Sequence, residues 1–514
     1  MDNKEKAIKE LVKSGIKSQV DLELAKREIA KKYKISVLLN SDILNKINVG
    51  TYNYASLRKI LRKRAVRTMS GIAPVAVLTK PYPCPGKCAY CPTEKDVPQS
   101  YLSNEPAVMR AIRCNYDPYI QVQARLKALE DNGHEPTKIE LIVIGGTWSV
   151  LPEIYKFWFI KECFRGANEF TQKHESTKTR KHKNTKAQKQ LFLQQKRNEK
   201  AKYKIIGLTL ETRPDYINEK ELLEMRELGA TRVELGVQAI DDKILKLNKR
   251  GHGVKEIADA TKLLKDFGFK VTYHIMPGLP GSTPTRDLKM FKQLFSDERF
   301  QPDQLKFYPT VVTKGSLLYK WWKAGKYKPY SDKILQKLII DCKKVVPKYV
   351  RIIRLIRDIP GESIVAGNMI TNLRQVMKQR GVNCSCIRCR EAQDKQFTIN
   401  NLQLTISKYN ASSGEEYFLE YTDKSGEVLY GFCRLRLGDE AFIRELHIYG
   451  ELVSIGAKRK IQHSGLGRKL MKEAERLAKK NNYDKIQVIS GVGVRDYYRK
   501  LGYKLKNTYM EKDL

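Results

Sequence analysis

The sequence has no apolar run long enough to cross a lipid bilayer. A membrane-spanning helix needs about 20 consecutive, mostly apolar residues, and no stretch of the 514 residues meets that requirement. The first residues, MDNKEKAIKELVKSG, also lack the apolar core of a signal peptide. We therefore expect a cytoplasmic protein that has no membrane partner.

Acidic residues are few, which leaves the chain strongly positive. There are 57 Asp and Glu residues against 97 Lys and Arg residues, a net charge of +40. A field of this sign attracts polyanions and favours nucleic acid as the partner, although a general lysine-rich composition is the alternative. The surplus is dense in residues 1–70, which we expect to form a basic, helical, tRNA-binding segment. The side chains predicted to contact phosphates there are Arg58, Lys59, Arg62, Lys63, Arg64 and Arg67.

Most of the 10 cysteines fall into two short clusters, which indicates metal ligation rather than disulfides. In CPGKCAYC, Cys84, Cys88 and Cys91 follow a C-x-x-x-C-x-x-C pattern. Three such thiolates can bind three irons of a 4Fe–4S cluster and leave the fourth iron open to S-adenosylmethionine (SAM). Zinc in a structural site prefers a fourth ligand, and none is nearby in the sequence. A disulfide is the other alternative.

The second cluster is CSCIRC, with Cys384, Cys386 and Cys389 in a linker at residues 366–394. Three thiols in six residues predict a metal site, and zinc is the favoured ion. A second iron–sulfur cluster and free thiols are the alternatives. The fourth ligand is not evident, and the candidates are Cys114, Cys163 and Cys342.

Residues 71–365 alternate short β-branched runs with helical stretches. Six runs, at 75–78, 139–147, 205–211, 232–238, 270–278 and 304–312, predict βα units in a complete or partial TIM-type barrel. The active site of such a barrel lies at the carboxyl ends of the strands, and the first cysteine motif follows the first strand. Gly145, Gly146 and Thr147 end the second strand and either approach a ligand or form a simple turn. The Lys-rich stretch 171–200 is expected to be a mobile basic loop.

A second α/β domain is predicted at residues 395–514. In QHSGLGRKLMKEAERLAKK, Gln462, Gly465 and Gly467 lie where a helix begins, and backbone N–H groups there favour a pyrophosphate. Tyr497 and Tyr498 follow in a Tyr-rich helix. They are either ordinary packing residues or catalytic groups that donate a proton or position a thioester.

The C-terminal stretch resembles the Gcn5-related N-acetyltransferase family, and the barrel resembles the radical SAM superfamily. The two in this order resemble the family of the catalytic subunit of Elongator, in its stand-alone archaeal form. Segments that carry the resemblance include VRTMSGIAPVAVLTKP, LTLETRPD, ELGVQ, HIMPGLPGS, ELHIYG and YYRKLGY. Eukaryotic relatives have a longer gap between the first two cysteines, a departure that leaves the ligand count unchanged.

This resemblance implies the cofactors 4Fe–4S cluster, SAM and acetyl-coenzyme A. It implies that Tyr90 contacts SAM, that the Gly145–Thr147 segment meets its methionyl group, and that Gln238 also binds a cofactor. For acetyl-coenzyme A it implies contacts from Lys138, Glu445, Leu446, His447, Ile448, Gln462, Gly465, Leu466 and Gly467. His447 also has an alternative role as a core or edge histidine.

The implied activity is modification of the wobble uridine, position 34, of tRNA. A SAM-derived radical would activate the methyl group of acetyl-coenzyme A, which is added to carbon 5 and hydrolysed to give 5-carboxymethyluridine. The expected partners are the anticodon arm of tRNA and an electron donor for the cluster. We expect a monomer or homodimer without obligatory Elongator subunits. The alternatives are a protein lysine acetyltransferase with a structural iron–sulfur cluster and a non-enzymatic tRNA scaffold.

Overall fold

The computed structural model describes residues 2–44, 46, 57, 60–62, 68, 70–170, 187–370, 373–379, 381–382, 384–393, 395, 401–450 and 465–514. Helices from the described ranges are all too short or too polar to cross a membrane. Several predicted site residues lie outside the described residues: Arg58, Lys59, Lys63, Arg64, Arg67 and Gln462.

The N-terminal segment is helical, as expected. Helices α1 (Asn3–Lys13), α2 (Gln19–Tyr33) and α3 (Asn40–Leu44) bury their apolar faces in a small core of their own. Leu61 completes that core. A Cβ on Gly133 would come within 2.7 Å of the Leu61 carbonyl, so Leu61 lies against the turn between α6 (Pro118–Asp131) and β2 (Lys138–Ile144). This places Arg62 at the amino ends of the barrel strands.

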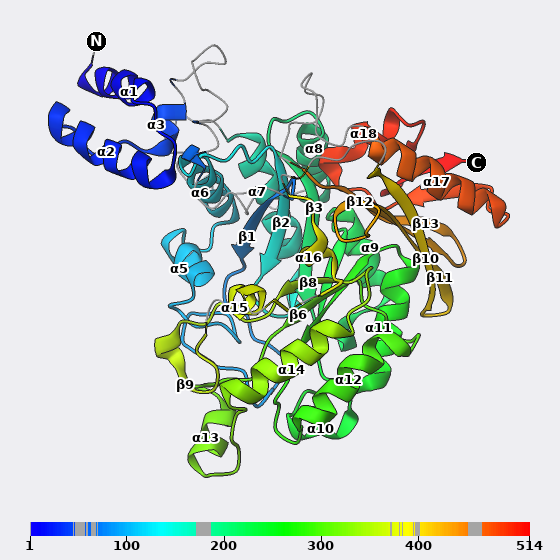
Figure 1. Cartoon of the computed structure of the whole chain (residues 1–514). Coiled ribbons are helices and arrows are strands. Elements are labelled where there is room, and N and C mark those ends of the chain that lie inside the picture. The colour runs from blue at the N-terminus through cyan, green and yellow to red at the C-terminus, as the bar shows by residue number, and fades with distance from the viewer. Residues whose placement is uncertain are drawn as a thin grey trace.

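A sheet of seven parallel strands forms the centre of the molecule (Figure 1). Its order is β1-β2-β3-β4-β5-β6-β8, and β1 and β8 do not pair, so the barrel is partial. The sequence predicted six of these strands and missed β8, whose four residues RIIR carry two arginines in place of an apolar run. The strands are β1 (Ala73–Leu78), β2, β3 (Lys204–Thr212), β4 (Arg232–Gln238), β5 (Lys270–Ile275), β6 (Gln304–Phe307) and β8 (Arg351–Arg354).

Helices between these strands cover the outside of the sheet and build the main core with it. The connections between strands carry α5 (Pro106–Arg113), α6, α7 (Glu153–Asn168), α9 (Glu219–Glu227), α10 (Asp242–Leu247), α11 (Val254–Asp266), α12 (Pro284–Ser296), α13 (Leu317–Lys323) and α14 (Asp332–Lys344). β7 (Val312–Thr313) and β9 (Ile364–Ala366), which are distant in the sequence, form a separate antiparallel sheet of two strands.

Part of the Lys-rich stretch is folded, contrary to the expectation of a loop. Helix α8 (Ala187–Asn198) packs on α7 and buries Leu191, Gln195 and Asn198. The Asn198 side chain donates to the Tyr203 carbonyl at 3.0 Å. Few apolar residues are enough here because buried polar side chains hydrogen-bond to backbone groups.

The C-terminal domain is a second seven-stranded sheet, in the order β10-β11-β12-β13-β14-β16-β15. Parallel pairing of β13 with β14 is limited to Phe442 with Gln487 and Ile443 with Val488, after which the two strands separate. The sequence did not predict β10, β15 or β16. The elements are β10 (Gln403–Ala411), β11 (Gly414–Thr422), β12 (Leu429–Leu437), β13 (Ala441–Ile448), α17 (Leu466–Lys480), β14 (Lys485–Val488), α18 (Arg495–Arg499), β15 (Lys504–Lys506) and β16 (Tyr509–Asp513).

Buried charges join the two domains. Asp303, just before β6, is completely buried and pairs with Arg444 of β13, with N–O distances of 2.5 and 2.9 Å. Arg444 also pairs with Glu416 of β11 at 3.0 Å, and Glu416 lies 3.4 Å from Lys265 of α11. Because each domain supplies part of this network, the buried charges of one domain would lack their partners without the other domain.

Candidate active site

The first cysteine motif forms a loop at the carboxyl end of β1, and backbone hydrogen bonds hold this loop on both sides. The Ala89 N–H donates to the Asn248 carbonyl at 3.0 Å, and the Leu318 N–H donates to the Ala89 carbonyl at 2.7 Å. The loop is therefore held between the end of α10 and the start of α13. The Arg250 guanidinium donates to the Cys88 Sγ at 3.2 Å, so a cation stabilises a thiolate at the centre of the motif.

The donor set fits a 4Fe–4S cluster better than a single zinc ion. Zinc–thiolate bonds of about 2.3 Å would draw all three sulfurs close together. Among the described residues, the ligand atoms of Cys384, Cys386 and Cys389 all lie within 4.8 Å of one another. The three thiols of the first motif do not come that close together. A hydrogen bond from Cys91 lowers the pKa of Cys88 to about 5; Arg250 contributes to this, while burial opposes it.

Buried polar atoms around the motif fit SAM as a polar ligand. Among the described residues, the Gln238 Oε1 and the Arg213 Nη1 are buried atoms without a hydrogen-bond partner, and both residues line the same cavity as Tyr90. Such atoms are rare in folded proteins and here mark a place for a polar ligand. Gln238 also has φ of 70°, a strained conformation that is frequent at ligand sites.

The three residues after β2 have different roles. A Cβ on Gly145 would come within 2.1 Å of the Thr79 Oγ1, so close packing against the end of β1 requires that glycine. Gly146 and Thr147 line the cavity, and the Thr147 hydroxyl lies 3.7 Å from the Cys84 Sγ. The segment is thus both a turn and a wall of the site, and the two interpretations left open by the sequence are compatible.

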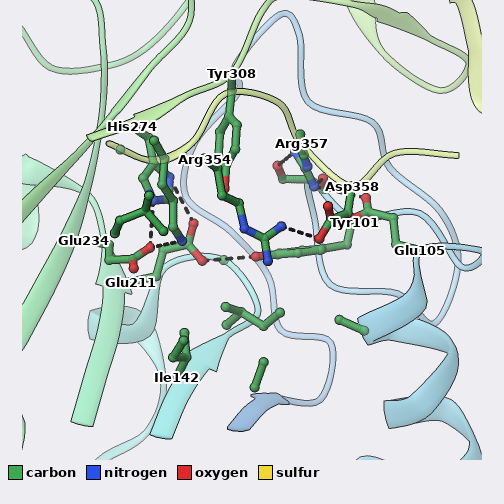
Figure 2. Close-up of a pocket in the computed structure, with 18 of the residues that line it drawn as sticks. Tyr101, Glu105, Ile142, Glu211, Glu234, His274, Tyr308, Arg354, Arg357 and Asp358 are labelled. Atoms are coloured by element: carbon green, nitrogen blue, oxygen red, sulfur yellow. Dashed lines mark hydrogen bonds and ion pairs between the residues drawn. The ribbon is translucent and has the colours of Figure 1, made fainter. Parts of the chain in front are cut away.

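Charged side chains line the inside of the barrel cavity, which has a volume of about 540 Å³. Figure 2 shows His274 between two carboxylates, with its Nε2 2.8 Å from Glu234 and its Nδ1 3.3 Å from Glu211. The Tyr101 hydroxyl donates to Glu211 at 3.0 Å, and Lys306 pairs with Glu234. Although burial opposes ionisation, Lys306 and His274 hold the pKa of Glu234 far below its usual range.

The sequence analysis did not identify these polar residues, yet a signal for them exists. Strands of a parallel sheet that is covered on both faces are normally almost entirely apolar. Titratable residues that line the cavity interrupt several of these strands, which marks an interior that holds a polar ligand. The residues include Glu140 in β2, Glu211 in β3, Glu234 in β4, His274 in β5 and Lys306 in β6.

The barrel cavity extends from the cysteine loop to residues that contact the C-terminal domain. Its lining includes Ser70, Pro74 and Ala76 along the chain that leads into and through β1. The His447 Nε2 of β13 lies 2.9 Å from the Ser70 carbonyl. Arg351, which also lines the cavity, donates to the Tyr449 hydroxyl at 2.7 Å. One end of the cavity therefore lies against the acetyltransferase-like strand β13.

The start of α17 has the features of a pyrophosphate site. Gly465 caps the helix with φ of 87°, and a Cβ there would meet no atom of the described residues within 4 Å. A Cβ on Gly467 would lie 2.7 Å from the Tyr497 hydroxyl and 3.6 Å from the Ile448 side chain. The helix N-terminus, Tyr497 and the end of β13 therefore meet at one place, where N–H groups and the helix dipole favour an anion.

The separation of β13 from β14 leaves room for an extended acyl arm. Glu445, Leu446, His447 and Ile448 follow the two residues that pair with β14, so their backbone lies along that opening. Such an opening allows an extended ligand to add to the free strand edge.

Tyr498 and Lys138 lie apart from this meeting point. Tyr498 is 6% exposed and packs edge-on against Tyr503 in the core of the C-terminal domain.

Lys138 begins β2 opposite Lys204 of β3, and burial lowers the pKa of Lys138. Lys200, just before β3, pairs with Asp496 of α18 at 2.6 Å. Lys138 thus lies at the strand ends that face the C-terminal domain.

The second cysteine motif brings its three thiols together around α16 (Ile387–Arg390). The Sγ atoms of Cys384, Cys386 and Cys389 all lie within 4.8 Å of one another. Within the described ranges, no fourth His, Cys, Asp or Glu comes as close to all three, so Cys114, Cys163 and Cys342 are not part of this group.

Comparison with known proteins agrees with the two-domain architecture. The family model described as Radical SAM superfamily matches residues 82–294, and the Radical_SAM C-terminal domain matches residues 302–381. The Acetyltransferase (GNAT) family model matches residues 386–503. Together these matches confirm the predicted fold class.

Full-length relatives are similar over nearly the whole chain. The tRNA uridine(34) acetyltransferase of Dehalococcoides mccartyi is 45% identical over 475 residues, covering 88% of this chain and 100% of the relative. Human Elongator complex protein 3 is 38% identical over 542 residues, covering 99% and 96%. The solved structure of Elp3 from the archaeon Methanocaldococcus infernus, with residues 1–46 deleted, is 40% identical with a TM-score of 0.73, covering 87% of this chain and 100% of that one. The chain therefore belongs to the family of radical SAM and acetyltransferase proteins that includes tRNA uridine(34) acetyltransferase and Elongator complex protein 3.

Proposed function

We propose that this protein modifies uridine 34 of tRNA, using acetyl-coenzyme A as the carbon donor to give 5-carboxymethyluridine. The observation that supports this most directly is that the cavity beside the cysteine loop is also lined by Ser70, whose carbonyl lies 2.9 Å from the His447 Nε2 of β13. A reaction that needs both SAM and acetyl-coenzyme A requires the two sites to communicate inside the protein. The relatives named above do not favour the alternative, a protein lysine acetyltransferase.

The cluster and SAM, when bound, supply the one-electron chemistry that activates the methyl carbon of acetyl-coenzyme A. Cys84, Cys88 and Cys91 hold the cluster, and Tyr90, Gln238 and the Gly146–Thr147 segment orient SAM. The hydrogen-bonded chain of Tyr101, Glu211, His274, Glu234 and Lys306 presents polar groups to the uracil inside a wall that excludes bulk water.

The acetyl-coenzyme A site proposed here lies in the C-terminal domain, beyond the side of the cavity that Ser70 lines. The pyrophosphate lies at the N-terminus of α17, with Gly465, Leu466 and Gly467, and the acyl arm follows Glu445–Ile448 toward the barrel. Tyr497, whose hydroxyl adjoins Gly467, positions the thioester. Tyr498 supports Tyr497 from the core, since the two rings lie 5.3 Å apart.

Mass analysis of tRNA nucleosides tests this function. Anaerobically reconstituted protein is incubated with a tRNA transcript, SAM, a chemical reductant and acetyl-coenzyme A labelled with ¹³C in the acetyl group. We expect labelled 5-carboxymethyluridine, and none when SAM is omitted. Label found in acetylated lysines, with or without SAM, and absent from uridine would overturn the proposal.

The replacement Gly467→Glu tests the acetyl-coenzyme A site. The new side chain would clash with the Tyr497 hydroxyl and place a carboxylate where the pyrophosphate binds. We expect affinity for acetyl-coenzyme A, measured by calorimetry, to fall at least about tenfold, or about 1.4 kcal/mol. Lys472→Glu, on the exposed face of the same helix, is the matched control and should bind normally. Equal affinities of the two variants would contradict the site.

We also propose that Cys384, Cys386 and Cys389 bind structural zinc, because their thiols already lie close enough for one ion. Zinc binding to such a site contributes directly to folding. Cys386→Ser should remove zinc, as measured by metal analysis. A loss of about 2 kcal/mol of unfolding free energy should lower Tm by roughly 4–8 °C, at 2–4 °C per kcal/mol for a domain of about 150–250 residues. Cys433→Ser, a buried cysteine outside both motifs, should retain zinc. Metal analysis that finds no zinc in the purified wild-type protein would refute this assignment.

A further inference from the structure

A second cavity, of about 310 Å³, opens between α10, the loop after β5 and α13. It shares no lining residue with the barrel cavity. Its walls include Leu247, Gly278, Trp321, Lys326, Tyr327 and Lys328. No residue of this cavity has a part in the function proposed above, so its chemistry needs a separate explanation.

This cavity adjoins the first cysteine motif. Ala89 of that motif is hydrogen-bonded to Asn248 on one side and to Leu318 on the other. Leu247 precedes Asn248 in the chain, and Trp321 lies about one turn of α13 after Leu318; both line the cavity. Figure 1 shows α10 and α13 together at the end of the molecule opposite the N-terminal helices. The cavity is therefore next to the carboxyl ends of the barrel strands, where the first cysteine motif lies.

The segment that supplies the Trp321, Lys326 and Lys328 side of the cavity is positive. No acidic residue occurs from residue 304 to residue 331. Within the described part of the chain, the lysines of this stretch that are exposed make no ion pairs, so their charge is available to a ligand. Such a set of cations favours a phosphate chain. These lysines are Lys314, Lys320, Lys323, Lys326 and Lys328.

Aromatic side chains give the cavity rigid walls. The Tyr327 hydroxyl donates to the Gly278 carbonyl at 2.7 Å, and the Tyr330 hydroxyl donates to Asp287 at 2.8 Å. The half-buried Trp321 lies on the same wall as Lys326. Fixed aromatic rings beside lysines form a stacking platform for bases of single-stranded nucleic acid, and the volume is at the lower end of the range for small-ligand pockets.

We propose that this cavity binds one unpaired nucleotide of the RNA substrate beside the uridine that enters the barrel. The base stacks on Trp321, and the adjoining phosphates lie at Lys326 and Lys328. The inference rests on the proposed function, because it takes the anticodon loop as the RNA. It adds a binding site at the carboxyl end of the barrel, whereas Arg62 lies at the opposite end.

Binding of an anticodon stem-loop RNA tests this site. The RNA is titrated into three reconstituted full-length proteins: the wild type, Trp321→Ala and Trp321→Phe. Base stacking on an aromatic side chain predicts a loss of about tenfold in affinity for Trp321→Ala. Most of this affinity should be retained in Trp321→Phe. Phe192→Ala, an exposed aromatic residue on α8, is the control and should bind as wild type does.

A second pair of variants tests the phosphate contacts and does not disturb the core. Lys326→Ala combined with Lys328→Ala should reduce the slope of log affinity against log salt by about 1.4, at about 0.7 for each single-strand contact. Lys289→Ala combined with Lys292→Ala, on the exposed face of α12, should leave the slope unchanged.

Photocrosslinking then identifies the nucleotide. With 4-thiouridine placed at one loop position at a time, we expect a position next to 34 to crosslink to the peptide that contains Trp321 and Tyr327. Unchanged affinity and salt slope in the Trp321 and lysine variants, with wild type still modifying tRNA, would overturn the site alone. Failure of wild type to bind or modify any tRNA would instead overturn the proposed function.

Discussion

Cys88→Ser should yield a protein that lacks the iron–sulfur chromophore and forms no detectable 5-carboxymethyluridine. Cys88 is the buried central thiol of its motif, and Arg250 stabilises its charged form. A serine hydroxyl is not ionised near neutral pH and is a poor ligand for iron, so the cluster would lose one of its three protein ligands. Iron analysis and absorbance of the anaerobically reconstituted protein measure the loss.

The same variant should bind tRNA within about twofold of wild type, because the positive surface is unchanged. Cys114→Ser, a buried cysteine outside both motifs, is the matched control and should keep both iron and activity. If Cys88→Ser retains a full complement of iron and still forms 5′-deoxyadenosine from SAM, the assignment of the motif is wrong.

Asp303→Asn should be among the most destabilising single replacements in the chain. The Asp303 carboxylate is fully buried against Arg444 and Arg434, and it also accepts a hydrogen bond from the Val271 N–H at 2.8 Å. The amide would leave two buried guanidinium groups without this counter-charge. Removing one partner from a buried ion network costs about 3–5 kcal/mol of unfolding free energy, which urea denaturation would measure.

Asp297→Asn is the matched control for Asp303→Asn. Asp297 pairs with Arg299 at 2.7 Å, but the arginine side chain is 56% exposed. An exposed pair contributes at most about 1 kcal/mol, so this control should unfold close to wild type. If Asp303→Asn lost no more unfolding free energy than Asp297→Asn, the domain interface would not depend on the network.

The same network predicts sensitivity to acid. Although burial opposes ionisation, Lys270 and Arg434 lower the pKa of Glu445 to about 2, and Arg444 holds the pKa of Asp303 far below its usual range. Groups whose pKa is lower in the folded state stabilise the protein above their unfolded pKa of about 4, and this stability is lost as the pH falls. Unfolding free energy should therefore decrease from about pH 5 toward about pH 2, and less steeply in Asp303→Asn.

Local sequence determined the cofactor motifs and most of the barrel. Three cysteines in eight residues after an apolar strand favour a cluster over zinc or a disulfide, because ligand spacing is a local property. Alternating apolar and helical runs predicted six of the seven parallel strands, because burial on both faces requires near-continuous apolar residues. The short strand β8 has no such pattern, and only its pairing with β6 makes it a strand.

The tertiary structure decided which polar residues act together. Glu211, Glu234 and His274 come from the strands β3, β4 and β5, and they meet because these strands pair side by side with Glu211 opposite Glu234. It also separated Tyr497, beside α17, from its neighbour Tyr498, which lies in the core, although the two are equivalent in the sequence. Side-chain direction and contacts between distant segments depend on packing, which a single sequence does not reveal. The motifs that indicate the cofactors are therefore local features of the sequence, whereas the arrangement of the two predicted sites relative to each other depends on the tertiary structure.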